Sequence, residues 1–241
     1  MDITTRVVSL VPSITETLLA WGIVPIACTR FCEQPLIVHV GGTKDPDVER
    51  ITAMRPTVVL MDREENRRDD AEALRSGGVE VFDTHVTSID DVGPVLAGLR
   101  RCLGLDPLSA DGDAAALAPA PAQSLLPRSA FVAIWRRPWM TLNHATYGSS
   151  LLASIGITNV FADDPQAYPV VELGQVAALQ PDVILLPSEP YAFGQRHVSE
   201  VRDAVPGADV RLVDGRDLFW WGVRTPGARR RLAQAIASPG E

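Results

Sequence analysis

One block of sequence occurs twice in this chain and limits its possible folds more than any other feature. Residues 48–61 read VERITAMRPTVVLM, and residues 173–186 read LGQVAALQPDVILL. In each copy an amphipathic helical segment meets a proline, which removes an amide donor and ends the helix. The continuous apolar run that follows is typical of a strand buried on both faces. Each copy therefore predicts a helix that leads into a parallel strand.

A second, shorter repeat occurs in the same order. Residues 18–23 read LLAWGI and residues 151–157 read LLASIGI, and in both a glycine stands where a helix can end in a left-handed turn. Two repeats in one order indicate an α/β fold of two Rossmann-like lobes with mostly parallel sheets and a ligand cleft between them. Chance similarity between any two βαβ units is the alternative.

The middle of the chain differs in composition from both halves. Residues 105–128 are rich in alanine and carry several prolines, including Pro119 and Pro121, which would break one long helix. We therefore expect an N-terminal α/β lobe over 1–104, a short proline-containing helical connector over 105–128, and a C-terminal α/β lobe over 129–241.

The composition of the chain argues against a nucleic-acid partner. Its 241 residues carry 30 acidic and 22 basic side chains, a net charge of −8. The first residues, MDITTRVVSLVPS, lack the basic and apolar regions of a secretory signal, and no apolar run reaches the ~20 residues that span a bilayer. As written, the sequence predicts a cytoplasmic protein, or an extracytoplasmic one if a signal was removed.

The sequence offers no recognised catalytic or metal-binding motif, so we expect no catalytic residue, metal or cofactor. Cys28, Cys32 and Cys102 form no disulfide framework, and buried or incidental thiols are favoured over a metal or a disulfide at Cys28 and Cys32. His39 and His144, facing each other from the two halves, are the alternative metal pair.

Several polar and flexible residues follow predicted strands of the first half. Ser13 precedes a helix with Glu16 three residues on, the pattern of a helix N-cap. Gly42 ends a Gly-Gly turn that permits close approach of the backbone. A charged run opens just past the next strand, with Arg63, Glu64 and Asn66 nearest the strand end. Because open α/β sheets bind ligands at the carboxyl ends of their strands, these residues are candidates for ligand contact.

Large aromatic side chains are few, but most of them lie at or just after predicted strand ends. Core packing explains some of them, and a cleft for a bulky, partly apolar ligand explains their concentration better. They are Phe31, Trp135, Trp139, Tyr147, Tyr191, Phe193, Phe219, Trp220 and Trp221.

Four arginines, Arg30, Arg63, Arg136 and Arg224, lie among these aromatics. Guanidinium groups pair with carboxylates or phosphates and also stack on rings, which favours a negatively charged ligand. Internal salt bridges, for example to Asp217, explain the same arginines equally well.

Three segments together resemble a known family. The segments RVVSLVPSITE at 6–16, DVERI at 47–51 and RPTVVL at 55–60 look like the class III, helical-backbone substrate-binding proteins of ABC importers, and most like their vitamin B12-binding, or helical-backbone metal receptor, branch. Such proteins bind cobalamin, ferric siderophores or haem. The resemblance implies two α/β lobes joined by one rigid helix, where this chain has a short proline-bearing connector, and binding without catalysis.

The resemblance also places ligand at particular loops: 12–15, the turns at Phe31 and Gly42, the strand exits at Arg63 and Trp135, and the aromatic loop at Trp220. These loops and the strand-end residues together give our predicted ligand contacts. They are Pro12, Ser13, Thr15, Arg30, Phe31, Gly42, Arg63, Glu64, Trp135, Arg136, Trp139, Tyr147, Glu189, Tyr191, Phe219, Trp220 and Trp221.

The resemblance implies an ABC permease as partner, engaged through one surface glutamate on each lobe. Glu64, Glu65, Asp69 and Asp70 lie near that place in the first lobe, whereas the loop 220–224 of the second lobe, WWGVR, carries no acid. Two other functions stay open. One is a metal-dependent enzyme that uses the same cleft, and the other is an interaction module that docks through Trp220 and Trp221.

Overall fold

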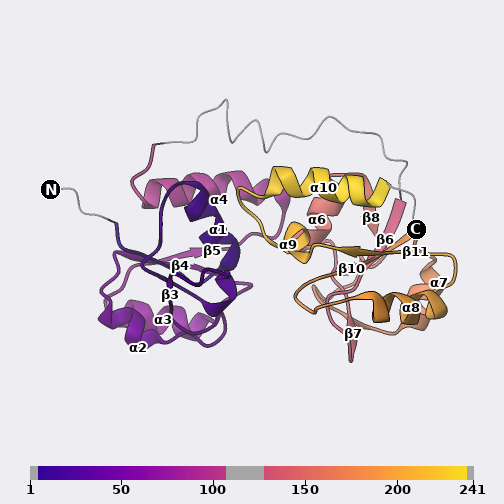
Figure 1. Ribbon diagram of the computed structural model, residues 1–241, viewed down its shortest axis with the longest axis horizontal. Helices are drawn as coiled ribbons and strands as arrows, with labels where there is room; N and C mark the ends of the chain where they lie inside the picture. Colours follow the sequence, from indigo (N-terminus) through magenta and orange to yellow (C-terminus); the bar gives the residue numbers. More distant parts are fainter. Residues whose placement is uncertain (1–4, 107–127, 238–241) are drawn as a thin grey trace. The chain divides into compact units, whose positions relative to one another are not determined.

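The computed structural model describes residues 5–106 and 128–237, which divide into two compact units (Figure 1). Unit 1 comprises Met1–Val86, Asp91–Ala115 and Trp221–Val223, and unit 2 comprises Thr87–Asp90, Ala116–Trp220 and Arg224–Glu241. The α/β class predicted from the sequence is confirmed. The predicted bounds of the lobes stay a prediction, and most of the predicted connector, 105–128, lies outside the described residues.

Unit 1 is built on a five-stranded parallel sheet with the order β3-β2-β1-β4-β5. The strands are β1 (Val7–Ser9), β2 (Ala27–Cys28), β3 (Val38–His39), β4 (Val58–Asp62) and β5 (Val81–Thr84). The helices are α1 (Pro12–Ala20), the 3-10 turn η1 (Arg30–Cys32), α2 (Val48–Ala53), α3 (Arg68–Ser76) and α4 (Ile89–Cys102).

Both faces of this sheet are covered, which is why its interior strand β4 begins with four apolar residues. All five residues of β4 are buried, as parallel strands between two helical layers require. On one face, Ile51 of α2 and Leu74 of α3 pack with Val8 and Val59 of the strands. Figure 1 shows α1 and α4 on the opposite side of the sheet.

Unit 2 repeats this plan with a four-stranded parallel sheet, order β11-β10-β6-β8. Its strands are β6 (Arg128–Val132), β8 (Ile157–Asn159), β10 (Val183–Pro187) and β11 (Asp209–Val213), and a separate antiparallel pair joins β7 (Trp139–Met140) to β9 (Val170–Val171). Its helices are α6 (Tyr147–Ala153), α7 (Leu173–Leu179), α8 (Gln195–Ala204), α9 (Gly215–Phe219) and α10 (Thr225–Ala237).

The core of unit 2, like that of unit 1, lies between the sheet and the helices that cover it. Phe131, Ile184 and Leu186 of the strands pack with Val176 of α7 and Val201 of α8. The central strand β10 is buried at all five positions, as β4 is in unit 1. The repeated apolar runs of the sequence therefore form interior strands of the two sheets, β4 and β10.

The repeat extends to the backbone. Arg55 and Gln180, the residues before the two corresponding prolines, both adopt left-handed conformations, with φ of 50° and 48°. Gly22 and Gly156 of the shorter repeat do the same, with φ of 77° and 84°. Left-handed φ is uncommon outside glycine, so its occurrence at matching positions confirms that the two blocks form the same helix-to-strand turn.

The residue after each repeated proline anchors the first strand of its unit. In unit 1 the backbone N–H of Arg6 donates to the hydroxyl of Thr57 (3.1 Å). In unit 2 the backbone N–H of Ser129 donates to the carboxylate of Asp182 (2.6 Å). One acceptor is a hydroxyl and the other a carboxylate, but in both units the residue after the proline accepts a backbone N–H at the start of the first strand.

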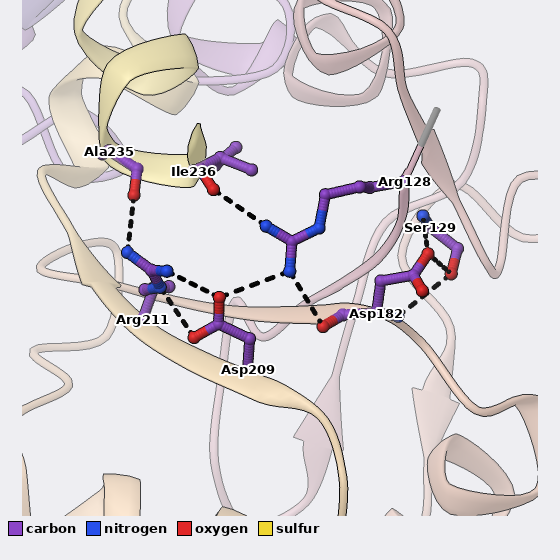
Figure 2. Close-up of polar contacts among 7 residues, drawn as sticks. All are labelled: Arg128, Ser129, Asp182, Asp209, Arg211, Ala235 and Ile236. Carbon is purple, nitrogen blue, oxygen red and sulfur yellow. Dashed lines mark hydrogen bonds and ion pairs between the residues drawn. The ribbon is translucent and has the colours of Figure 1, made fainter. Parts of the chain in front are cut away.

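A polar network closes the amino end of the unit 2 sheet (Figure 2). Arg211 makes two hydrogen bonds to Asp209, of 2.7 and 2.6 Å, and donates to the carbonyl of Ala235 (2.9 Å). Arg128 donates to the carbonyl of Ile236 (2.8 Å) and to Asp209 (3.3 Å). Since the last carbonyls of a helix lack partners within it, the two arginines stabilise the end of α10 and attach it to the strands.

The start of α1 differs from the sequence prediction. The helix begins at Pro12, its N-cap is Val11, and no side chain caps it. Ser13 is a buried residue inside the first turn, so its prediction as the N-cap was wrong. Proline is well suited to the first helical position because the missing N–H has no intrahelical partner there, and this moves the helix start one residue before the serine.

Candidate functional site

In unit 1 the strand order changes direction between β1 and β4. The chain runs outward from β1 to β3 and then returns to the other side of β1 with β4. Open α/β sheets bind ligands beyond the carboxyl ends of the strands at such a switch point. Residues 10–13 after β1 and 63–67 after β4 occupy this position, and they include several of the predicted contacts.

Pro12, Ser13 and Thr15 lie at the start of α1, beside this switch point, and all three are buried. The hydroxyl of Thr15 lies 2.9 Å from that of Ser9 and 3.2 Å from the sulfur of Cys32. In the described structure Thr15 therefore serves to join α1 to β1 and η1.

Arg30, Phe31 and Gly42 come together at the ends of β2 and β3. The Arg30 guanidinium pairs with Asp45 (3.0 Å) and lies 4.8 Å from the centre of the Phe31 ring, which is 50% exposed. A side chain at Gly42 would displace the side-chain ends of Arg30 and Asp45, so the glycine leaves room for this ion pair. The half-exposed ring of Phe31 is the apolar surface that this group offers.

Arg63 and Glu64 follow β4 directly. Arg63 forms an ion pair with Asp83 (3.0 Å), with its side chain 63% exposed. The Glu64 carboxylate lies 3.7 Å from Nε2 of His85, and the Glu64 carbonyl accepts from the Lys44 ammonium (2.7 Å). This end of the sheet thus exposes charges of both signs.

Asn66 holds the loops of this edge together, a role that sequence reasoning did not assign to it. Its side-chain amide donates to the carbonyls of Leu10 (3.1 Å) and Thr43 (2.9 Å), and its oxygen accepts from the backbone N–H of Asp62 (2.9 Å). Burial raises the pKa of the neighbouring Asp62 carboxyl. The position just after a strand was the only signal for Asn66, because its partners are distant in sequence.

In unit 2 the switch point lies between β6 and β10, since the chain passes from β6 to β8 on one side and to β10 and β11 on the other. Trp135 and Arg136 follow β6, and Glu189 and Tyr191 follow β10. The predicted contacts of this unit therefore gather where such a sheet binds ligands.

An aromatic cluster fills this end of unit 2; it consists of Trp135, Trp139, Tyr191, Phe193 and His197. Trp135 meets Tyr191 edge to face with ring centres 5.5 Å apart, and Trp139 stacks on Phe193 at 5.8 Å. Tyr191 contacts Phe193 at 4.7 Å, and both contact His197. Trp135 stays 43% exposed although it packs on the cluster, so it presents a supported aromatic face to the outside.

His197 is the buried polar member of the aromatic cluster. Its Nδ1 accepts from the backbone N–H of Gly194 (3.0 Å), and the side chain is 2% exposed. Burial, with the nearby positive charges of Arg196 and Arg136, lowers its pKa. The sequence pattern gave no reason to separate this histidine from the other three.

Each of the four arginines singled out in the sequence has a carboxylate partner within its own unit. Besides Arg30 and Arg63, Arg136 pairs with Glu200 (2.8 Å) and Arg224 with the buried Asp217 (2.8 Å). The Glu200 carboxylate raises the pKa of Arg136 through hydrogen bonding. The internal salt bridges left open by the sequence are therefore present, and any anion must share these guanidinium groups with protein carboxylates.

The other predicted ligand-binding residues of unit 2 lie outside the aromatic cluster. Tyr147 is buried at the start of α6, where its hydroxyl bonds to that of Thr225 (2.9 Å) and burial raises its pKa. Phe219 ends α9 and lies close to Gly148. Trp220 is half-buried beside Arg224, whose guanidinium lies 5.6 Å from its ring.

Trp221 is 4% exposed and belongs to unit 1 with Gly222 and Val223. Val223 donates its backbone N–H to the hydroxyl of Thr17 (3.4 Å), and a side chain at Gly222 would strike that same hydroxyl. An exposed patch made of both Trp220 and Trp221, the predicted docking surface, is therefore not formed.

The two histidines of the alternative metal site each bond to a local carbonyl, His39 to that of Gln34 and His144 to that of Ala162. Across residues 5–106 and 128–237 no three His, Cys, Asp or Glu side chains are grouped to hold a metal ion. Within the same ranges no helix combines the length and apolar character needed to cross a membrane.

Comparison with known proteins shows which fold this chain shares. The family model described as periplasmic binding protein matches residues 7–92. The periplasmic vitamin B12 binding protein of Vibrio cholerae has the same fold, with a TM-score of 0.80, 21% identity and 96% of each chain covered. The periplasmic heme-binding protein from Roseiflexus sp. RS-1 also gives 0.80, with 22% identity and coverage of 97% of this chain and 98% of that one. The chain has the fold of a two-lobed periplasmic binding protein.

The curated relatives that match this chain are named for vitamin B12 binding. The vitamin B12-binding protein of Photorhabdus laumondii is 27% identical over 193 residues, which cover 75% of this chain and 70% of the relative. The resemblance to class III substrate-binding proteins, and to their vitamin B12-binding branch, is confirmed.

Proposed function

We propose that this protein binds a bulky metal chelate without transforming it, as the substrate-binding proteins of ABC importers do. A corrinoid of the cobalamin type is the first candidate, and haem or a ferric siderophore is the second. The predicted contacts of the sequence stand as the proposed ligand-binding residues, with three of the exposed ones, Phe31, Arg63 and Trp135, as the first to be tested.

The observation that carries this proposal is the aromatic cluster at the carboxyl ends of β6 and β10. Trp135 is held edge to face by Tyr191 and yet leaves nearly half of its surface exposed. A large, rigid aromatic surface suits a flat, partly apolar macrocycle, because contact removes much area from water at a low cost in entropy.

The comparisons support the choice of ligand. Relatives named for vitamin B12 binding match three quarters of the chain, and solved structures named for vitamin B12 and for heme have equal TM-scores. Cyanocobalamin is therefore the first probe, and hemin and a ferric hydroxamate siderophore follow.

The direct test is a titration of the purified protein with each probe, with the fluorescence of its five tryptophans as the signal. We expect saturable quenching by cyanocobalamin or, if the ligand is the second candidate, by hemin or the siderophore. No saturable signal with any of the three, checked by equilibrium dialysis, would contradict the proposal.

The variant Trp135→Ala should weaken this binding. Removing an anchoring aromatic ring commonly costs more than ~1 kcal/mol, about a fivefold loss of affinity. Tyr168→Ala is the matched control, because Tyr168 is an aromatic residue of the same unit with nearly the same exposure, 42%, but does not follow β6 or β10. Equal losses in both variants would argue against a ligand on the aromatic cluster.

The absence of catalysis is part of the proposal and has its own measurement. The ligand recovered by denaturing the complex after long incubation should have the mass and absorption spectrum of the ligand added. Appearance of a modified product in proportion to the protein would instead favour the enzyme alternative.

The proposed partner is a membrane permease. The proposed place of action is the outer side of the cytoplasmic membrane. The solved structures that share the fold are named as periplasmic proteins, and Asp69 and Asp70 in the first turn of α3 are proposed docking acids of unit 1. Fractionation of the source cells should recover the protein outside the cytoplasm, and recovery with cytoplasmic markers alone would contradict this part.

A further inference from the structure

His197 connects the start of α8 to the loop that carries Tyr191. This loop, residues 188–194, runs from the end of β10 to Gly194, the residue just before α8. The backbone N–H of His197 donates to the carbonyl of Gly194 (2.8 Å), and the N–H of Gly194 donates back to Nδ1 of the His197 ring (3.0 Å). This reciprocal pair of hydrogen bonds fixes the end of the loop on the helix.

The ring of His197 also supports the aromatic side chains of the loop. It meets Tyr191 edge to face with ring centres 5.5 Å apart, and Phe193 at 5.3 Å. Tyr191 in turn packs against Trp135. A displacement of the His197 ring therefore removes support from the aromatic face that Trp135 presents, which is the proposed ligand contact.

The hydrogen bonds of His197 define its protonation state. A backbone N–H can only donate, so Nδ1 carries a lone pair, and the proton of the neutral ring is on Nε2. Nε2 lies 3.5 Å from the Tyr191 hydroxyl and 3.2 Å from Nε of Arg196. Arg196 also can only donate, but it is exposed, so its guanidinium is free to turn toward water.

A second proton on the ring is incompatible with these contacts. In the imidazolium both nitrogens carry hydrogen, so the Nδ1–H and the Gly194 N–H point at each other across 3.0 Å. The Gly194 amide then loses its acceptor, and the ring, 2% exposed, carries a buried charge. Protonation of His197 therefore favours an open loop, in which both groups reach water.

The charged groups around the ring oppose its protonation on balance. Arg196 of α8 and Arg136, which follows β6, are positive, whereas Glu200 of α8 is negative and pairs with Arg136 (2.8 Å). Burial, followed by the two guanidinium charges, lowers the pKa of His197, and the charge of Glu200 offsets only part of this shift. The closed loop therefore belongs to the neutral ring.

We propose that His197 is a pH-sensitive latch for loop 188–194, and that its protonation at mildly acidic pH opens the loop and weakens binding of the chelate. The part that concerns the chelate rests on the proposed function. In the open loop the ring has the ordinary histidine pKa of about 6.5, and in the closed loop its pKa is lower. The closed loop is therefore fully favoured above pH ~6.5 and loses this advantage as the pH falls below that value.

The size of the effect follows from the proton equilibrium. At about pH 5.5, one unit below the ordinary pKa, roughly ten protonated rings exist for each neutral ring in the open loop. The ratio of open to closed loop therefore increases by at most about tenfold. The affinity falls only as far as the open loop becomes populated, so we expect a loss of about two- to tenfold between about pH 7.5 and 5.5.

The latch itself is measured in the protein without ligand, by amide hydrogen exchange followed by NMR. The protection of the Gly194 N–H, corrected for the pH dependence of intrinsic exchange, should fall by up to about tenfold between about pH 7.5 and 5.5. The Ala133 N–H, which donates to Leu185 within the sheet (3.1 Å), is the control and should keep its protection. Unchanged protection at Gly194 would overturn the proposal.

The variant His197→Asn separates protonation from structure. The oxygen of the Asn side chain stands near the position of Nδ1 and accepts from Gly194, but it does not titrate. The affinity of this variant for cyanocobalamin, or for hemin if only hemin binds, should be the same at both pH values. An unaltered pH dependence in His197→Asn would contradict the role of this ring.

Two further variants complete the comparison. His197→Phe keeps an aromatic ring without an acceptor and should bind at least about twofold more weakly than the unchanged protein at neutral pH. His144→Asn replaces an exposed histidine of the same unit and should show the pH profile of the unchanged protein. Circular dichroism verifies that each variant is folded, and exchange at Gly194 in the unchanged protein decides the matter if one is not.

The outcomes for the latch and for the proposed function are distinct. A failure of the unchanged protein to bind any probe at either pH contradicts the proposed function, while exchange at Gly194 still decides whether the latch exists. Equal affinities at the two pH values, together with a pH-dependent Gly194 amide, overturn the link to the chelate alone.

Discussion

Single buried polar residues organise the loops of both candidate regions. Asn66 connects three loop backbones in unit 1, and His197 binds the Gly194 N–H beneath the aromatic cluster in unit 2. Each satisfies backbone groups that would otherwise be buried without a partner. These residues fix the loops that carry the proposed ligand contacts, although neither is itself exposed.

Replacement of Asn66 should therefore destabilise the protein. Asn66→Ala leaves two buried carbonyls and one buried N–H without their partner, and we expect unfolding to become easier by about 2–4 kcal/mol. The measurement is chemical denaturation. Arg67→Ala, at the exposed next position, should change the free energy of unfolding by less than ~0.5 kcal/mol. A similar small effect at Asn66 would show that water replaces its hydrogen bonds.

The sequence predicted the surface members of the site better than the residues beneath them. Trp135 and Tyr191 could be found because a residue just after an apolar strand in an α/β protein lies at the ligand-binding edge. Asn66 depends on the carbonyls of Leu10 and Thr43, up to 56 positions away, and no local pattern marks such partners. Ser13 shows the reverse case, in which a local pattern was present and Pro12 determined the helix start.

At the scale of elements, the helix, proline and strand of the repeated block act as one module. In both copies the turn before the strand requires a left-handed residue, supplied by Arg55 and by Gln180. A residue with a Cβ atom is strained in this conformation and a β-branched residue more so. The sequence predicted where each helix ends and each strand begins, but the left-handed turn was not expected, because neither residue is a glycine.

We expect the two turns to respond alike to substitution. Arg55→Gly and Gln180→Gly should change stability by less than ~1 kcal/mol, since relief of strain offsets the added freedom of the unfolded chain. Arg55→Val and Gln180→Val should each cost about 1–2 kcal/mol more than the glycine variants. Thermal denaturation of the four variants tests this, and a valine that is tolerated as well as glycine would show that the turn is unstrained.

The network at the amino end of the unit 2 sheet should make stability depend on pH. Hydrogen bonds from Arg211 lower the pKa of Asp209 in the folded protein, below its unfolded value of about 3.9. The stabilisation is therefore complete above that unfolded pKa and is lost as the pH falls through the lower folded one.

Asp209→Asn should cost about 1–3 kcal/mol at neutral pH, because it removes one charge from a paired, half-buried group. The difference from the unchanged protein should begin to shrink as the pH falls below the unfolded pKa of about 3.9, and it should be lost as the pH falls through the lower folded pKa of Asp209. Asp203→Asn removes the same charge from an exposed position of α8 and serves as control. A penalty that is constant down to acid pH would mean that packing, not charge, is lost.

At the scale of the whole molecule, the fold class could be predicted from the sequence, and so could the resemblance to periplasmic binding proteins. The two repeated apolar strands indicated two parallel sheets, and three short segments indicated the family resemblance. The order of the strands could not be predicted, because β-pairing is determined by contacts between distant segments.

Bound ligand should stabilise the whole protein if the proposed function is correct. At a free ligand concentration of about 100 times Kd, the gain is ~2.7 kcal/mol, which for a protein of this size corresponds to a Tm increase of roughly 5–10 °C. Differential scanning fluorimetry with cyanocobalamin and with hemin measures it. Trp135→Ala should show a smaller shift at the same concentration, and an unshifted Tm with both ligands at concentrations that quench fluorescence would indicate unspecific quenching.

The assignment of residues 221–223 to unit 1, and of 87–90 to unit 2, has a consequence for any attempt to divide the gene. A fragment that stops after α4 carries the five strands of unit 1 but lacks the segment whose Val223 N–H bonds to Thr17. The complementary fragment lacks Ile89, whose N–H bonds to Ser150 of unit 2. Neither fragment contains all the residues of its folded unit. Two separately expressed fragments should therefore each be less stable alone than when they are combined.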